Sequence, residues 1–150
     1  MSRNHDYYQI SLKLLLKNKK NEFLILKVED RSKFNGFYDF PGGRIEIDEY
    51  DTDILEILKR EVAEEIGENC QYKILSDRPV GFGRHEDYSR TYQKNVRYFY
   101  LLFEAEITSG EVEISEEHAD FLWLSFETIK NNLDKLFVSG LLECAKMYFR

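Results

Sequence analysis

The sequence predicts an α+β fold, in which helices pack on a mixed β-sheet, and three observations favour this fold. Apolar residues occur in short runs, such as residues 10–16 and 23–28, that are typical of strands separated by turns. Residues 53–66 instead have the apolar spacing of an amphipathic helix. With 150 residues, of which 43% are apolar, the chain is long enough to bury one core, so we expect a single domain over residues 1–150.

The first part of the chain is expected to supply strands. The two apolar runs flank a polar tip at 17–21, which predicts a β-hairpin. Residues 29–36 are expected to form a loop. Residues 37–40 predict a short aromatic strand that stops at the sequence Pro41-Gly42-Gly43.

The helix predicted over 53–66 has clear signals at both ends. Asp53 and Glu56 have the spacing of a capping box at the start, and Gly67 suits the C-terminal cap. One apolar stripe along it consists of Leu55, Leu58, Val62 and Ile66. This face is expected to lie in the core.

The second half of the chain predicts further strands and then helices. Strands are expected at 71–83 and 96–107, with a polar loop between them that contains His85, Glu86, Asp87, Tyr88 and Tyr92. Residues 111–119 are acidic and predict a loop, and 121–124 predict a short strand with Phe121 and Trp123 in the core. One or two amphipathic helices are expected from there to residue 150, whereas His5 and His118 are interpreted as surface residues.

The composition excludes several classes of protein. Acids outnumber bases 28 to 21, and the net charge of −7 argues against binding of long nucleic acid. The most apolar run, 98–103, is far shorter than the roughly 20 residues of a membrane span, and the N-terminus lacks a signal peptide. Cys70 and Cys144 have no zinc-ligand spacing and are interpreted as reduced thiols. We therefore expect a cytoplasmic protein that does not bind membranes, and a homodimer is compatible with this sequence.

The predicted helix carries an unusual acidic face. On a helix that advances about 100° per residue, one narrow arc carries Glu61, Glu64, Glu65 and Glu68. Like charges at these spacings cost about 0.2–0.5 kcal/mol a pair. Neither Lys59 nor Arg60 lies within the arc to neutralise it. Such a face is either simply solvated or binds a divalent cation, and carboxylate oxygens suit Mg²⁺ or Mn²⁺.

Together with the glycines before it, this helix resembles the Nudix hydrolase family, whose sequence box reads G-x5-E-x7-R-E-U-x-E-E-x-G-U, with U a bulky apolar residue. Gly43 is followed after five residues by Glu49, and residues 60–67 match the block from R to G throughout. Two positions depart from the pattern. Ten residues separate Glu49 from Arg60 where the family has seven, so 50–53 are expected to lengthen the loop and the role of Glu49 stays open. The last apolar position is Glu68, either an outer acid or a solvated one.

The resemblance implies a single Nudix hydrolase domain with the family's α/β/α sandwich, in which helices cover both sides of a mixed sheet. It implies Mg²⁺ as the cofactor, with Mn²⁺ as a substitute, held by Glu61, Glu64, Glu65 and, from the acidic loop, Glu117. Glu116 is the alternative to Glu117. The catalytic residues that it implies are Glu61, Glu64 and Arg60, the last orienting a glutamate through a salt bridge.

For the substrate, the resemblance implies a small nucleotide-like diphosphate contacted at Gly42, Gly43 and Arg44. The implied reaction is Mg²⁺-dependent hydrolysis of the pyrophosphate bond in a nucleoside diphosphate linked to another group, or in a related nucleotide. The alternative is a module of the same fold that binds a nucleotide or phosphorylated effector without cleaving it. A third hypothesis, an isoprenoid diphosphate isomerase, would need a catalytic cysteine, and nothing marks Cys70 as reactive.

Overall fold

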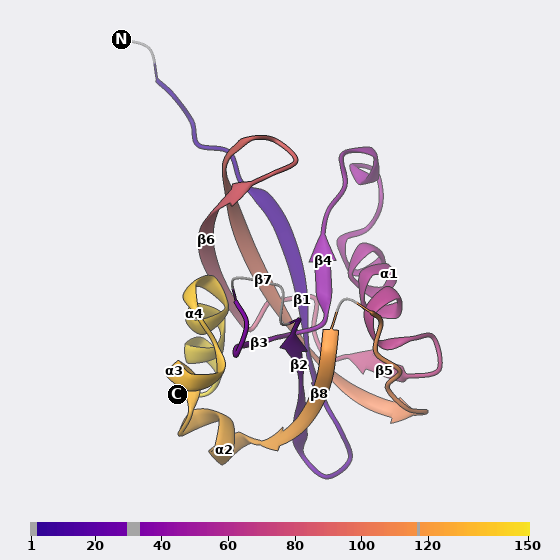
Figure 1. Ribbon diagram of the computed structural model, residues 1–150. Helices are drawn as coiled ribbons and strands as arrows, with labels where there is room; N and C mark the ends of the chain where they lie inside the picture. The colour runs from indigo at the N-terminus through magenta and orange to yellow at the C-terminus, as the bar shows by residue number, and fades with distance from the viewer. Residues whose placement is uncertain (1–2, 30–33, 117) are drawn as a thin grey trace.

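A computed structural model describes residues 3–29, 34–116 and 118–150, and it shows one mixed sheet with helices on both faces (Figure 1). The strands are β1 (Gln9–Lys17), β2 (Glu22–Val28), β3 (Tyr38–Asp39), β4 (Gly42–Arg44), β5 (Gln71–Ile74), β6 (Gly81–Ser89), β7 (Lys94–Ser109) and β8 (His118–Ser125). The helices are the 3₁₀ turn η1 (Ile47–Glu49), α1 (Ile54–Ile66), α2 (Phe126–Lys130), α3 (Leu133–Leu136) and α4 (Ser139–Tyr148).

The sheet is built around two parallel strands. β1 and β7 pair from Gln9 opposite Tyr98 to Lys17 opposite Glu106, and the other pairings are antiparallel. The strand order is β3-β2-β1-β7-β5, with β4 on β1, β6 on β7 and β8 on β2. Residues 11–16 of β1 are all buried, as expected of a strand covered on both faces. The predicted mixed sheet is confirmed.

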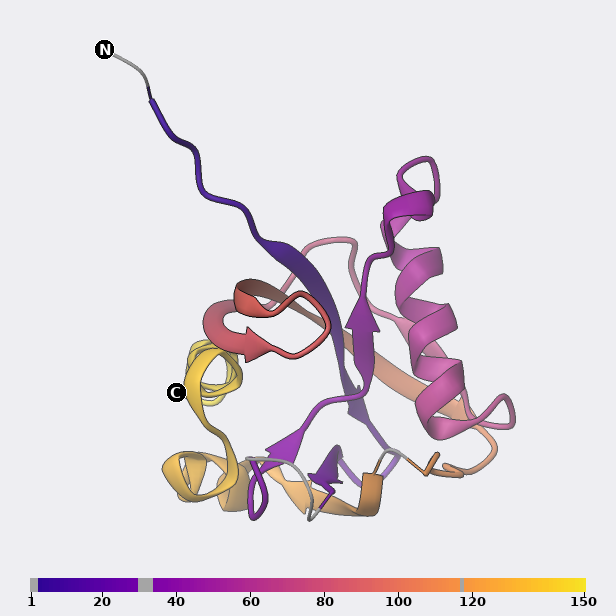
Figure 2. The ribbon, with the colours of Figure 1, turned by 45° about the horizontal axis from the view of Figure 1, so that its top comes forward.

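Each face of the sheet has its own apolar core. On one face, Ile57, Leu58, Val62 and Ile66 of α1 pack with Leu12, Leu14 and Leu16 of β1. On the other, Phe137, Cys144, Ala145 and Phe149 pack with Leu15, Phe23 and Phe40. Figure 2 shows α1 on one side of the central strands and α4 on the other. The expected sandwich, with helices on both sides of the sheet, is therefore present.

The helix predicted over 53–66 is α1, and its ends follow the sequence signals closely. The Asp53 side chain accepts a hydrogen bond of 2.9 Å from the Leu55 N–H, and the Gly67 N–H donates to the Ala63 carbonyl. Glu56 does not complete the expected capping box, because its carboxylate pairs with Lys59 Nζ at 3.3 Å. Gly67 has φ +83°, a conformation that favours glycine, and the helix ends there.

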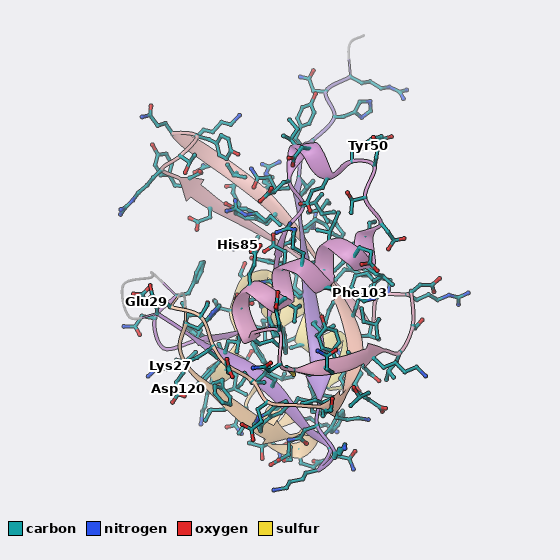
Figure 3. All side chains as sticks on the ribbon, turned by 90° about the vertical axis from the view of Figure 1, so that its right-hand side faces the viewer. Lys27, Glu29, Tyr50, His85, Phe103 and Asp120 are labelled. Carbon is teal, nitrogen blue, oxygen red and sulfur yellow. The ribbon has the colours of Figure 1, made fainter. Side chains whose placement is uncertain are left out.

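Several expected segments differ from the structure because strands pair over long distances. The hairpin of β1 and β2 pairs only near its turn, at Lys17 and Phe23, since β1 then pairs with β4 and β7 while β2 pairs with β3 and β8. The pairing of β2 with β8 joins distant parts of the chain, and it places Lys27 opposite Asp120 (Figure 3). The strand predicted over 37–40 is β3, which ends before Pro41 as expected, but Gly42 and Gly43 then form a further strand, β4, against β1.

The prediction of a polar loop between the strands at 71–83 and 96–107 is also wrong. β6 continues to Ser89 and β7 begins at Lys94, so most of this segment is a hairpin. Successive polar residues of β6 point to opposite faces of the strand, so that Arg84 is exposed and His85 is partly buried. The end of the acidic loop likewise begins β8 at His118, and the C-terminal part forms three helices rather than one or two. Within the described residues, none of the helices is long and apolar enough to cross a membrane.

Removing the Phe149 ring should test whether the C-terminal helices belong to the cooperative core. Phe149 is fully buried, and its ring lies 5.1 Å from that of Phe23 in a T-shaped arrangement. We expect Phe149→Ala to lower the free energy of unfolding in urea by about 3–5 kcal/mol, because the cavity is enclosed by other side chains. Glu143→Ala, an exposed position of α4, is the control and should change it by less than about 0.5 kcal/mol. Equal stabilities would contradict the packing.

Candidate active site

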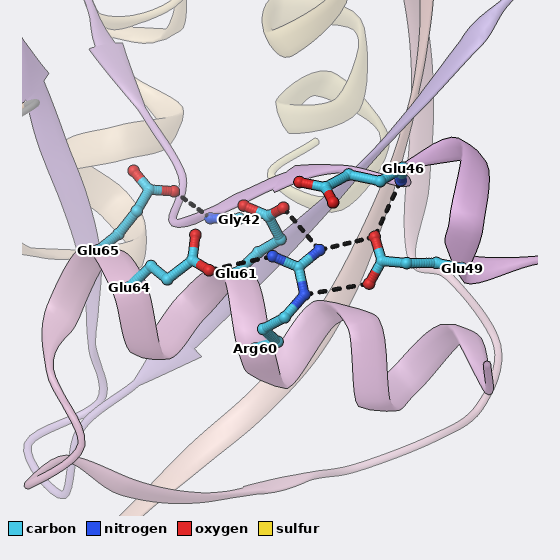
Figure 4. A network of polar contacts seen from close by, with 7 residues as sticks. All are labelled: Gly42, Glu46, Glu49, Arg60, Glu61, Glu64 and Glu65. Carbon is cyan, nitrogen blue, oxygen red and sulfur yellow. Dashed lines mark hydrogen bonds and ion pairs between the residues drawn. The ribbon is translucent and has the colours of Figure 1, made fainter.

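The site is centred where β4 passes over α1. Lys13 of β1 is opposite Gly42, and the carbonyl of Pro41 accepts a 2.8 Å hydrogen bond from the Leu14 N–H. The N–H of Gly42 in turn donates to Glu65 Oε1 at 2.7 Å (Figure 4). This hydrogen bond joins the sheet to the acidic face of the helix.

Neither glycine can be replaced without a collision. Gly42 has φ +149°, and a Cβ there would overlap the carbonyl oxygen of Leu12. A Cβ on Gly43 would overlap the carboxylate of Glu61. The first collision is with backbone, whereas the second is with the end of a side chain. Gly42 is therefore required by the fold, and Gly43 by the position of Glu61.

The guanidinium of Arg60 contacts the carboxylates of three glutamates (Figure 4). Its Nε and Nη2 donate to the two oxygens of Glu49 at 3.0 and 2.7 Å, a bidentate pair. Nη2 also lies 2.9 Å from Glu61 Oε1, and Nη1 lies 3.1 Å from Glu64 Oε1. The expectation that Arg60 does not neutralise the acidic face is wrong, because its long side chain reaches back over the helix.

Glu49 reaches Arg60 in spite of the longer loop. The turn η1 closes with a reciprocal pair of contacts, in which the Glu46 N–H donates to Glu49 Oε1 at 2.9 Å and the Glu46 side chain accepts from the Glu49 N–H. The Glu46 N–H and the Arg60 guanidinium hold the pKa of Glu49 below its usual value. The added residues extend away from the helix, with Tyr50 exposed at the end of this loop (Figure 3). The insertion therefore leaves the pairing of Glu49 with Arg60 intact.

Glu61 lies in a partly desolvated position beside Gly43. Burial raises the pKa of its carboxyl, and the nearby charges of Glu64 and Glu46 act in the same direction. Arg60 opposes this effect through its charge and its hydrogen bond. A carboxylate with a raised pKa in such a position is a good candidate for a proton acceptor or a cation ligand.

Glu65 is the most buried of the acids on the helix, with 5% of its surface exposed. Its Oε1 accepts from Gly42, and its Oε2 lies 3.1 Å from Nδ1 of His118 at the start of β8. The interpretation of His118 as a surface residue is wrong, since only 8% of its side chain is exposed. Glu116 and Glu117 precede it in the sequence, and contacts with distant parts of the chain, in β2 and at the end of α1, bring it to Glu65.

A second buried charge was also missed by sequence reasoning. Lys13 is buried in β1, and its Nζ lies 3.0 Å from Asp39 Oδ2. Burial alone would lower the pKa of Lys13, but the carboxylates of Asp39 and Glu65 outweigh it and raise that pKa. A lysine between leucines in a strand gave no sign of this pair, since Asp39 comes from a separate strand.

Other expected site residues lie farther from this centre. Glu68 follows the end of α1 and is exposed, so the expected helical face carries three acids and not four. Glu64 is 61% exposed and is paired with Arg60. The Arg44 guanidinium lies 5.4 Å from the centre of the Tyr98 ring, and its Nη1 donates to Gln9. Glu117 lies outside the described residues, and the adjacent Glu116 is exposed.

The donor set of the helix fits a hard divalent cation. Among the residues that the structure describes, no group of three His, Cys, Asp or Glu side chains already lies close enough to hold a metal. The acids are instead held by Arg60, by the Gly42 N–H and by His118. Two of them, Glu61 and Glu65, are poorly solvated, and Gly43 lacks the Cβ that would fill the space beside Glu61. Carboxylate oxygens in such a place favour Mg²⁺ or Mn²⁺.

Comparisons with known proteins place this chain in a family. A family model described as the NUDIX domain matches residues 8–141. The chain is 31% identical over 121 residues to the nucleoside triphosphatase NudI of Klebsiella pneumoniae strain 342, covering 78% of this chain and 82% of the relative. A NudI of Escherichia coli O139:H28 is 30% identical over 118 residues, with 77% and 80% covered.

Solved structures show the same architecture. The MutT protein from Methanosarcina mazei Go1 has a TM-score of 0.68 and 26% sequence identity, with 97% of this chain and 93% of that chain covered. A NUDIX hydrolase from Nitrosomonas europaea has a TM-score of 0.61 at 15% identity, covering 95% and 88%, which shows a likeness of fold alone.

The two glycines of β4 should have separable effects when replaced. Gly42→Ala is expected to lower the free energy of unfolding by about 2 kcal/mol or more, because its Cβ would collide with backbone. Gly43→Ala should fold nearly as well but lose turnover, since its Cβ displaces Glu61; misplacement by about 1 Å can cost about 10²-fold. Urea unfolding and turnover of any diphosphate that the parent cleaves measure the two effects. Full turnover by Gly43→Ala would show that the position of Glu61 is unimportant.

Proposed function

This chain belongs to the Nudix family, and from that premise we propose that it is a Mg²⁺-dependent hydrolase of phosphoanhydride bonds in small nucleotide-like diphosphates. The observation that carries the proposal is the meeting of Glu61 and Glu65 with the glycines of β4. There, two poorly solvated carboxylates lie against backbone without side chains, and carboxylate oxygens suit a divalent cation that carries a phosphate.

In the proposed mechanism, Glu61, Glu64 and Glu65 hold the metal, with Glu117 as the ligand expected from the loop. The bound cation would neutralise phosphate charge and lower the pKa of a water molecule. Glu61 accepts the proton of the attacking water, a role that suits its raised pKa. No covalent intermediate on the protein is required.

Arg60 has the role of orienting the acids. Its bidentate contact with Glu49 fixes the guanidinium, and the same group contacts Glu61 and Glu64. Through these contacts, Arg60 keeps Glu61 aimed toward Gly43. Gly42 and Gly43 let the substrate approach the backbone closely.

The substrate is proposed to be a nucleotide. Two relatives in this family are nucleoside triphosphatases by name, which favours nucleoside triphosphates among the candidates. The negative net charge of the chain suits a small substrate with its own cation better than a long RNA. A panel of nucleoside triphosphates, nucleotide sugars and dinucleoside polyphosphates, with products identified by mass, gives both the substrate and the bond that breaks.

Turnover should require a divalent cation. We expect activity on the best substrate of the panel to disappear after exhaustive chelation and to return with Mg²⁺ or Mn²⁺, because the acids cannot bind an anionic diphosphate alone. Stopped assays with and without added metal measure this. Full turnover in chelator would contradict the metal mechanism. Binding of the nucleotide without any cleavage, with metal present, would instead identify a non-catalytic binding module.

Glu61 and Glu68 should differ sharply in their effect on catalysis. Glu61→Gln is expected to lower kcat by about 10²-fold or more, because the amide can neither accept the proton nor bind the cation as strongly. Glu68→Gln is the matched control, since Glu68 is exposed beyond the end of α1. Melting curves of both variants should match the parent. Similar kcat values for Glu61→Gln and the parent would remove Glu61 from the reaction.

A further inference from the structure

We propose that His118 is a positioning residue that fixes the carboxylate of Glu65 in the orientation needed to bind the divalent cation. The inference rests on the proposed function, in which Glu65 is a metal ligand. It adds a residue outside the helix and the glycine strand, and it gives the segment before β8 a defined task at the site.

The first argument is the contact itself. His118 Nδ1 lies 3.1 Å from Glu65 Oε2, and both side chains are more than nine-tenths buried. An ionised carboxylate can only accept hydrogen bonds, so the favourable arrangement has the proton of the imidazole on Nδ1. Burial removes competing water and makes such a contact stronger than it would be at the surface.

The second argument is that each of the two oxygens of Glu65 has its own neighbour. Gly42 N–H donates to Oε1, and His118 lies against Oε2. Two fixed points, one on each oxygen, determine the plane of the carboxylate. A carboxylate oxygen can accept more than one contact, so a cation can share the group with these partners. Outer partners of this kind are known to orient metal ligands and raise their affinity.

The third argument is that His118 is held firmly from both sides. Before it, the Glu113 N–H donates to the Ile66 carbonyl and the Ser115 N–H donates to the Glu65 carbonyl, both at 2.9 Å. After it, β8 pairs with β2, and His118 itself lies opposite Val28. The end of α1 and the edge of the sheet therefore set the position of the imidazole. A side chain so held can impose an orientation on Glu65 instead of following it.

The test measures metal binding in the absence of substrate. Mn²⁺ is titrated into the full chain and the free ion is followed by its electron paramagnetic resonance signal. His118→Leu keeps much of the bulk but removes the donor, and we expect Mn²⁺ affinity to fall by about 10-fold or more. His118→Asn places an amide N–H near the former Nδ1 and should recover most of the affinity. His118→Gln, whose amide lies farther out, should recover less.

A matched control separates this role from general anchoring of the segment. Asn69→Ala removes the 3.1 Å hydrogen bond from Asn69 Nδ2 to Glu113 Oε1, which ties the same segment to the end of α1 without touching Glu65. This variant should keep parental Mn²⁺ affinity. If Asn69→Ala weakens Mn²⁺ binding as much as His118→Leu, anchoring of the segment explains the effect and the positioning role is wrong.

The remaining outcomes also decide. An orienting partner is worth about 10-fold or more in metal affinity. If His118→Leu binds Mn²⁺ within about twofold of the parent, the positioning role is wrong, although the proposed function stands. If His118→Leu fails to fold, the comparison of Asn with Gln at this position decides, and equal affinities would overturn the role. A parent protein that binds no Mn²⁺ and cleaves no diphosphate would overturn the proposed function and this inference with it.

Discussion

The hydrogen bond from the Gly42 N–H to Glu65 is the contact on which the arrangement of the site depends. It requires the backbone of β4 to come within 2.7 Å of a carboxylate on α1. The pairing of Gly42 with Lys13 holds that backbone against β1, where a side chain at Gly42 would collide with Leu12. Because Gly42 has no Cβ, β4 can lie against β1 and still donate a hydrogen bond to the buried Glu65 carboxylate on α1. The close approach of β4 to α1 also leaves the carboxylate of Glu61 beside Gly43, which has no Cβ to displace it.

The concentration of negative charge is tolerated because the acids at the site contact cationic or hydrogen-bonding groups. Arg60 serves Glu49, Glu61 and Glu64, while Glu65 has a backbone N–H and an imidazole. Buried charges cost several kcal/mol each when they lack such partners. Arg60 is suited to this task since one planar group can serve several carboxylates at once. These contacts order the acids of the site within the protein itself.

The sequence predicted what depends on neighbours along the chain and missed what depends on distant pairing. α1 and its caps at Asp53 and Gly67 were predicted because local spacing and capping chemistry determine them. The strand at 84–89 was missed, since it lies at an edge of the sheet and carries polar residues on both faces. His118 was misjudged for a similar reason, because its burial comes from β2 and α1. The helical wheel excluded Arg60 from the acidic face because a wheel gives the direction of Cβ and not the reach of a long side chain, whereas the family resemblance implied its salt bridge with a glutamate.

The parallel pairing of β1 with β7 has a consequence for how the chain reaches its native state. Gln9 and Lys17 find their partners only at Tyr98 and Glu106, so the centre of the sheet joins parts of the chain that are far apart in sequence. Such contacts raise the contact order, and closing large loops before any gain in contact energy slows folding. During synthesis on the ribosome, β1 is complete long before β7 emerges, and its apolar residues remain an unpaired edge for that interval. Aggregation during expression should therefore begin from this strand, at a stage when the glycines of β4 and the acids of α1 have been made but His118 has not.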